Sequence, residues 1–141
     1  MCSSDLARSA SFAIPGGKGG LFCHTPLVAV ARNLSRKQAL EMAMTGDPVS
    51  AETALQWGFV NSVVDDADLD GAVADLLGRA TRGSSWSKAL GKRTFYEQIS
   101  MEESEAYAFA SAVMADAVTG DAAQEGISAF LEKRQPDFGD R

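Results

Sequence analysis

The sequence predicts an α/β chain in which helices dominate, with one or two short strands followed by about six helices. Two observations lead to this class. Polar and apolar residues alternate weakly over 9–14, just before Pro15, which is typical of a short strand that enters a loop. Further along, helix-capping residues and apolar residues three or four apart recur to the end of the chain, which indicates successive helices.

Two helices are predicted after the glycine-rich stretch 16–20. Thr25, with proline directly after it, has the character of an N-cap followed by the first helical position. Ser35, with glutamine three residues later, has the spacing of a capping box. The apolar residues behind Ser35 continue that second helix to Gly46.

A third, short helix is predicted from Ser50 to Gly58, and an extended segment over 59–64. Three or more helices follow. An apolar stripe marks one over 69–80, and a second is expected over 86–98.

A capping box at Ser100 predicts the next helix, and Asp121 opens the last one, which Pro136 ends. The last helix is expected to bury one face, formed by Ile127, Phe130 and Leu131.

The composition of the chain argues against several classes of function. The chain has 141 residues, of which 45% are hydrophobic and 23% charged, as in one ordinary globular domain. Its net charge of −6 argues against a nucleic-acid partner, and no apolar run approaches the roughly 20 residues that span a membrane. Two cysteines are too few for a disulfide framework, and no His/Cys cluster predicts a metal site. We therefore expect a reducing, cytoplasmic location.

The first six residues, MCSSDL, fit neither a strand nor a helix cap. They match the translation of the end of a common sequencing adapter read from a GTG start codon. Residues 1–6 are therefore predicted to be a non-native extension, the alternative being an ordinary polar N-terminus. A lone strand also needs a sheet, so we expect the natural gene to continue upstream.

The stretch FAIPGGKGGLFCHTP (12–26) gathers the candidate functional residues. Lys18 is flanked by glycines, but Gly19 follows it where a Walker phosphate loop needs Ser or Thr, so that site is disfavoured. The glycines are expected to shape a tight loop. Cys23 and His24 are adjacent, so their side chains diverge in most backbones, and loop packing is favoured over a catalytic pair.

Three segments resemble the C-terminal half of the enoyl-CoA hydratase/isomerase (crotonase) superfamily. They are ASFAIPGGKGGLFCHTP (10–26), RKQALEMAMTGDPVSAETALQWGFVNSVV (36–64) and DAAQEGISAFLEKRQPDF (121–138). The resemblance implies a core spiral of ββα units, with 7–64 as its end. It implies that 65–141 forms a C-terminal helical region that builds homotrimers, often hexamers.

The resemblance also implies a substrate, an acyl-CoA thioester, with no cofactor or metal besides. Two backbone N–H groups of the family form an oxyanion hole, and hydratases add two glutamates for acid–base work. The oxyanion hole and the first glutamate would lie upstream of this chain. The second follows proline in the motif F-x-x-P-E, where this sequence has Gly16, as expected of a divergent subgroup.

Other site residues follow from the same resemblance. Phe130 and Lys133 match an aromatic residue and a lysine that approach the nucleotide end of coenzyme A, and Gly20 belongs to the substrate-binding turn. Cys23 and His24 are the pocket candidates in place of the missing acid. If the pocket is otherwise intact, replacing Gly16 with glutamate is expected to raise hydration in the longer protein.

Two functions remain open. The first is a fragment, itself inactive, of an enzyme that hydrates or isomerises enoyl-CoA in fatty-acid metabolism. The second is a non-catalytic protein of the same fold that binds coenzyme A or serves assembly, which Gly16 favours. An unrelated helical interaction module is disfavoured by the order of the motifs.

Overall fold

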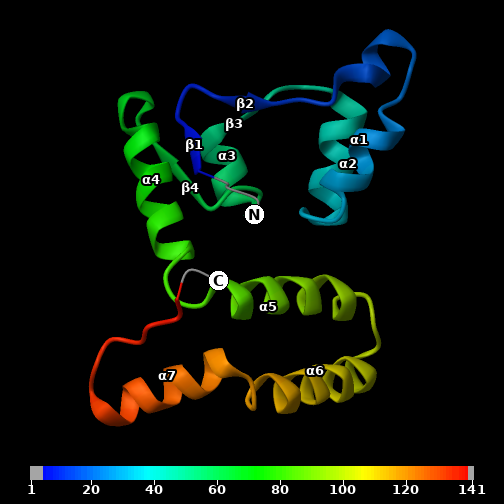
Figure 1. The fold of residues 1–141 in the computed structure, drawn as a ribbon. Helices are drawn as coiled ribbons and strands as arrows, with labels where there is room; N and C mark the ends of the chain where they lie inside the picture. The colour runs from blue at the N-terminus through cyan, green and yellow to red at the C-terminus, as the bar shows by residue number, and fades with distance from the viewer. Residues whose placement is uncertain (1–4, 140–141) are drawn as a thin grey trace. The chain divides into compact units, whose positions relative to one another are not determined.

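A computed structural model describes residues 5–139 and divides the chain into two compact units, one up to Leu77 and one from Gly78 onward. The described residues form four short strands and seven α-helices, shown in Figure 1. The predicted class, α/β with helices dominant, is confirmed. The expected one or two strands were too few, because strands of two or three residues are too short to show alternation.

Two pairs of very short strands lie in the first unit. β1 (Asp5–Ala7) runs parallel to β4 (Ser62–Val64). β2 (Ser11–Phe12) runs antiparallel to β3 (Val49–Ser50). Each pair joins segments that are far apart in the sequence, so the strands tie the beginning of the unit to its later half.

The strands differ from their predicted bounds. The segment expected over 9–14 is a strand only at Ser11 and Phe12, since only these two residues pair with β3. The segment expected over 59–64 is a strand only in its last three residues. Asp5 and Leu6 of the predicted N-terminal extension lie in β1, and residues 1–4 lie outside the described residues. The origin of the extension stays a prediction.

Four helices begin in the first unit. They are α1 (His24–Val30), α2 (Arg36–Thr45), α3 (Ala51–Gln56) and α4 (Leu69–Ala80). The division between the two units falls inside α4, after Leu77, whereas the sequence placed a change of region at 64–65. The assembly role expected for the later region stays a prediction.

The predicted caps of α2 and α3 are confirmed. The Ser35 hydroxyl accepts the Gln38 N–H at 3.4 Å, and the Gln38 side chain accepts the Ser35 N–H at 3.1 Å, which completes the capping box. Ser50 accepts the Thr53 N–H at 3.2 Å. Gly46 closes α2 in the left-handed region, with φ 60°.

The cap predicted at Thr25 was wrong, because α1 begins earlier, at His24. The first helical hydrogen bond runs from the Leu27 N–H to the Cys23 carbonyl, at 3.1 Å, so Cys23 takes the N-cap position. Pro26 then lies within the first turn, where the missing N–H has no helical partner to lose.

The core of the first unit draws on its strands, loops and helices. Its buried apolar residues are Ile14, Val30, Leu34, Ala39, Met42, Ala43, Val49, Ala54 and Val60. Met42 is only 2% exposed, while Met44 on the same helix is 72% exposed. The face of α2 that carries Met42 therefore faces this core.

The second unit contains α5 (Ser85–Gln98), α6 (Glu103–Ala117) and α7 (Asp121–Glu132). Ser84 caps α5 by accepting the Ser87 N–H at 3.1 Å. The capping box predicted at Ser100 was wrong. Glu102 takes the N-cap position of α6, in an extended conformation, and makes no side-chain capping bond.

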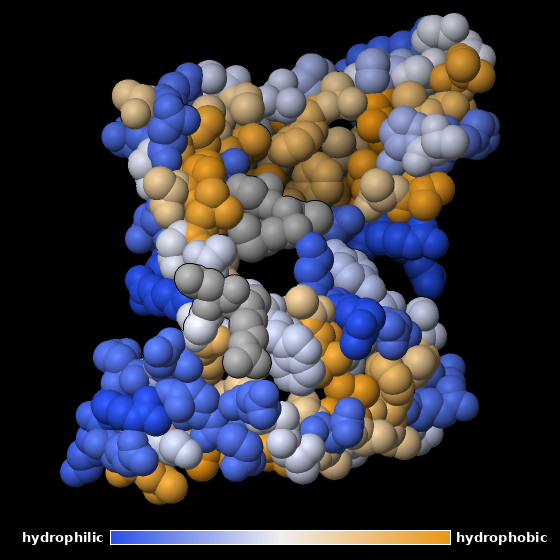
Figure 2. Space-filling model, viewed as in Figure 1, coloured by the Kyte–Doolittle hydropathy of each residue, from blue (hydrophilic) through white to orange (hydrophobic). Residues whose placement is uncertain are grey.

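The apolar face predicted for α7 is exposed, which corrects the sequence-based prediction. Ile127, Phe130 and Leu131 are 45%, 82% and 73% exposed. Ala129 is the buried residue of this helix, and α7 ends at Glu132 rather than near Pro136. Large apolar side chains therefore lie on the surface of this unit, as the orange areas in Figure 2 show.

None of the described helices combines the length and the apolar character that crossing a membrane requires.

Candidate functional site

The loop from Pro15 to Cys23 carries most of the predicted pocket residues. It begins as a 3-10 turn over Pro15–Gly19 and leads into α1. The Leu21 N–H donates to the Gly16 carbonyl at 3.1 Å, and the Gly16 N–H donates to the Cys23 sulfur at 3.1 Å. The backbone thus folds back so that Leu21 and Cys23 both contact Gly16.

Gly16 has no room for a side chain in this loop. A Cβ atom at this position would lie 2.3 Å from the Leu21 carbonyl oxygen and 2.6 Å from the Cys23 sulfur. Both distances are far inside van der Waals contact, which for carbon atoms is about 3.5–4.0 Å. By contrast, a Cβ on Gly19 of the same loop would meet no atom within 4 Å.

Cys23 and His24 differ in their surroundings. Cys23 is half-buried, and its sulfur accepts the Gly16 N–H. His24 is exposed, and its ring meets the Phe22 ring edge to face, with centroids 5.1 Å apart. The structure therefore brings Cys23, and not His24, next to Gly16, where the sequence analysis predicted that an acid is missing.

The outer side of the loop packs on the end of α2. The Lys18 ammonium contacts an Asp47 carboxylate oxygen at 2.6 Å, in an exposed ion pair of the kind that contributes about 0–1 kcal/mol. A Cβ on Gly46 would lie 3.0 Å from the Pro15 Cα. Gly20 is exposed, with φ 84°, where the chain turns away from the 3-10 turn.

The two predicted coenzyme A contacts lie at the end of α7. Phe130 is 82% exposed. Lys133 is also exposed and follows the helix in the left-handed conformation, with φ 55°. Both side chains are thus available to a ligand or to another protein chain.

The sequence did not predict a group of polar contacts between α7 and the residues that follow Lys133. The Glu125 carboxylate accepts bonds from two Arg134 nitrogens, at 2.5 and 2.9 Å, and from the Asp137 N–H at 2.7 Å. These contacts, first of all those with Arg134, lower the pKa of Glu125 to about 2. They raise the pKa of Arg134. Because Arg134 lies beyond the end of the helix, no helical spacing pointed to this pair.

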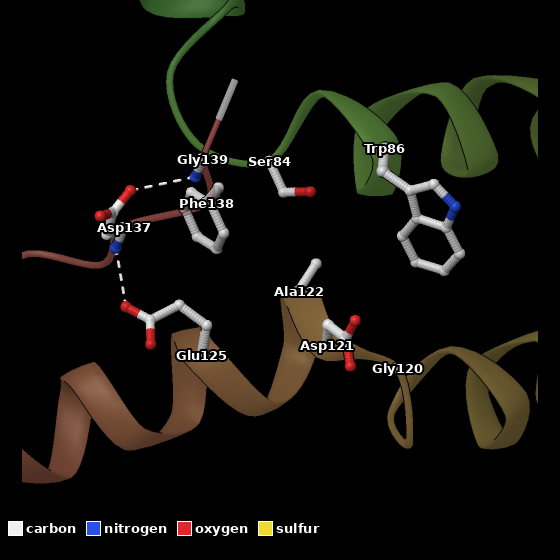
Figure 3. Close-up of a pocket in the computed structure, with 9 residues that line it drawn as sticks. All are labelled: Ser84, Trp86, Gly120, Asp121, Ala122, Glu125, Asp137, Phe138 and Gly139. Atoms are coloured by element: carbon white, nitrogen blue, oxygen red, sulfur yellow. Dashed lines mark hydrogen bonds between the residues drawn. The ribbon is translucent and has the colours of Figure 1, made fainter. Parts of the chain in front are cut away.

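A cavity of about 620 Å³ lies beside these contacts in the second unit (Figure 3). In Figure 3 the Trp86 side chain of α5 points toward Gly120, just before α7, and Phe138 points toward α7 between Ala122 and Glu125. The remaining lining residues are Ser84, Gly120, Asp121, Ala122, Glu125, Asp137 and Gly139. None of the sequence-predicted site residues lines this cavity, although its volume is within the ordinary range of small-molecule pockets.

Within residues 5–139 no three His, Cys, Asp or Glu side chains gather where they could hold a metal ion.

Several known proteins are similar to this chain. Rat enoyl-CoA hydratase domain-containing protein 3, mitochondrial, is 43% identical over 139 residues, which cover 96% of this chain and 46% of the relative. The crystal structure of an enoyl-CoA hydratase from Mycobacterium smegmatis superposes with a TM-score of 0.91 at 42% identity, over 95% of this chain and 52% of that one.

The crystal structure of human enoyl-CoA hydratase domain-containing protein 3 also gives a TM-score of 0.91. It is 42% identical and is matched over 94% of this chain and 53% of its own. The chain thus spans about half the length of the curated relatives it matches.

The cytoplasmic location expected from the sequence is contradicted by these relatives. The rat, mouse and human proteins are all named mitochondrial. Low cysteine content indicated only a reducing environment, and that property does not separate the cytoplasm from other reducing compartments.

The family assignment rests on the whole length of the chain. The model of the enoyl-CoA hydratase/isomerase family matches residues 4–141, and it therefore includes both the glycine-rich loop and the C-terminal helices. The resemblance inferred from the three sequence segments is confirmed, and the superposed structures share the crotonase fold. This chain belongs to the enoyl-CoA hydratase/isomerase family.

Proposed function

We propose that this chain belongs to a protein that processes acyl-CoA thioesters, by hydration or isomerisation of an enoyl-CoA in fatty-acid metabolism. The observation that carries the proposal is the family match over residues 4–141. In this chemistry, backbone N–H groups stabilise an enolate-like thioester oxygen, and one such donor contributes about 2.7–4 kcal/mol in well-studied enzymes. Coenzyme A enters as part of the substrate.

The C-terminal end of α7 is proposed to contact the nucleotide end of coenzyme A. The exposure of Phe130 and Lys133 supports this role, since an aromatic face can stack on a base and an ammonium group can meet phosphate. Gly20 is proposed to lie at the substrate-binding turn of the glycine-rich loop.

Calorimetric titration with coenzyme A tests this contact. Replacing Lys133 with alanine is expected to weaken binding and to make it less sensitive to salt, because one phosphate contact is lost. Lys92→Ala is the matched control, because Lys92 is exposed on α5 of the same unit. Equal binding by both variants would remove Lys133 from the site.

The chain by itself is proposed to lack hydratase activity. Of the two glutamates that hydratases use, the second position is Gly16, and the first has no counterpart here. The purified chain is expected to leave the conjugated double bond of crotonyl-CoA intact, which its ultraviolet absorbance reports. Rapid loss of that absorbance would contradict the proposal.

The alternative is a non-catalytic protein of the same fold that binds coenzyme A or serves assembly. The absence of room for a side chain at Gly16 favours it. Tight binding of acyl-CoA by the longer protein without any turnover would support the alternative, whereas turnover would exclude it.

Assembly into a homotrimer or hexamer is proposed for the longer protein. The exposed apolar side chains of α6 and α7, including Tyr107 and Met114 at 67% and 72% exposure, support this state because such groups usually meet a partner. Analytical ultracentrifugation of Met114→Glu against Glu105→Gln, an exposed control on the same helix, tests the interface. The first variant is expected to shift the protein to monomers.

A further inference from the structure

Three glycines of one loop differ sharply in the space around them. A Cβ on Gly16 would overlap the Leu21 carbonyl oxygen, at 2.3 Å. A Cβ on Gly17 would meet its nearest atom at 3.4 Å, which is an ordinary contact, and Gly19 faces open space. Only the first of these three positions therefore requires glycine for reasons of space.

The atoms that exclude a side chain at Gly16 are held in place. The Leu21 carbonyl belongs to a backbone turn that the Leu21 N–H closes onto the Gly16 carbonyl, at 3.1 Å. The sulfur of Cys23 accepts the Gly16 N–H, and Cys23 itself precedes the first turn of α1. A side chain at 16 would thus have to move the Leu21 backbone as well as the Cys23 sulfur.

The far side of the turn leaves little freedom for such a movement. The end of α2 packs against it, as the 3.0 Å approach of a Gly46 Cβ to Pro15 shows, and Lys18 is paired with Asp47.

From these contacts we infer that Gly16 and Cys23 form one steric unit that determines which functional group this loop presents. The sulfur lies where a side chain at 16 would begin, so the loop offers the Cys23 thiol and excludes a carboxylate from residue 16. Cys23 acts as a positioning residue, since its sulfur holds the Gly16 N–H and with it the turn.

The chemical meaning of this unit rests on the proposed function, because residue 16 is the acid position of the related hydratases. The sequence-based expectation that Gly16→Glu would raise hydration is replaced by the opposite one. A glutamate at 16 cannot enter the present loop without displacing Leu21 and Cys23, so it distorts the loop instead of restoring an acid.

Alkylation of Cys23 tests the steric part of the inference, in a Cys2→Ser background so that only one thiol reacts. Gly16→Ala is expected to raise the rate with iodoacetamide about fivefold or more, because over-packing of this kind strains a site substantially. Gly19→Ala is the matched control and should leave the rate unchanged. If Gly16→Ala fails to fold while Gly19→Ala folds, this outcome would also show that a side chain at residue 16 disturbs the loop. Equal rates in both variants would overturn the inference.

Amide hydrogen exchange of Gly16, followed by NMR, tests the positioning role without adding any atom to the loop. Cys23→Ala is expected to speed exchange about two- to tenfold, which corresponds to one lost hydrogen bond. Cys23→Ser keeps an acceptor and is expected to restore most of the protection. Unchanged exchange in Cys23→Ala, or no rescue by serine, would contradict the role of the sulfur. Neither experiment involves acyl-CoA, so a failure of the proposed function would be seen separately.

Discussion

The two units of this chain are built differently, although both are mainly helical. The first unit buries a set of apolar side chains beneath its strands and helices, from Ile14 to Val60. In the second unit only Ala129 and Ser84 are buried among the described residues, and large aromatic and aliphatic side chains are exposed. The first unit thus has a core of its own, whereas the second presents apolar surface that is suited to covering by other protein.

Shortening a methionine side chain in each unit tests whether only the first unit has a core. Met42→Ala, at a site 2% exposed, is expected to destabilise the first unit by about 2–5 kcal/mol, because it leaves a cavity. Met44→Ala on the same helix and Met114→Ala in the second unit are expected to change stability by about 0.5 kcal/mol or less.

Tryptophan fluorescence during urea unfolding can report each unit separately. Trp57 lies in the first unit and Trp86 in the second, so Trp86→Phe or Trp57→Phe leaves one reporter. If Met114→Ala lowers the free energy of unfolding of the isolated chain as much as Met42→Ala does, the second unit has an internal core. The proposed difference between the two units would then be wrong.

The helix caps of the two units are expected to differ in how much they stabilise the chain. Ser35→Ala is expected to destabilise the first unit by about 1 kcal/mol, because Ser35 takes part in a complete capping box. Glu102→Ala at the start of α6 is expected to change little, since Glu102 makes no capping bond through its side chain. Urea unfolding of the two variants, with the reporters described above, measures the difference. A large loss in Glu102→Ala would reveal a role that its backbone position does not explain.

The smallest change in stability is expected at the end of α7, when the pH is lowered. Contacts with Arg134 and the Asp137 N–H lower the pKa of Glu125 to about 2, below the value of about 4.3 for an unperturbed glutamate. The stabilisation from these contacts is therefore complete above the unfolded-state pKa and is lost as the pH falls through that range toward 2.

Carboxyl chemical shifts measured by NMR would give this pKa directly. Arg134→Gln should raise the pKa of Glu125 toward its ordinary value, while Arg93→Gln, in an exposed pair with Glu97 on α5, should leave it unchanged. If Glu125 titrates near 4.3 in the unaltered chain, the C-terminal segment is not held as described.

Local signals in the sequence were sufficient for the boundaries of α2 and for the cap of α3, but not for the start of α1. The Ser35 capping box, the Ser50 cap and Gly46 were all found, because each acts within three or four residues of its partner. The start of α1 was missed because Pro26 suits either the first position or the first turn equally well. The helix begins at His24 because the loop places the Cys23 carbonyl where it accepts the Leu27 N–H.

The candidate site was only partly predictable. The sequence drew attention to Gly16, Cys23 and His24, but it could not say which of the two side chains lies beside the glycine. That answer depends on how the turn folds back when the Leu21 N–H donates to the Gly16 carbonyl, and the residue pattern of this loop did not predict that contact. The Glu125–Arg134 pair was missed for the same reason, since it forms only after the chain reverses at Lys133.

The residue pattern alone was enough to predict the helical character of this protein, the capping box at Ser35, the family and the absence of an acid at position 16. These properties depend on residue identity and on short spacings, which survive in any chain context. The tertiary structure decided which apolar faces are buried and what fills the space at Gly16. Periodicity shows that a helix has an apolar face, as in α7, but burial requires a partner surface, and for Phe130 and Leu131 this chain supplies none among its described residues.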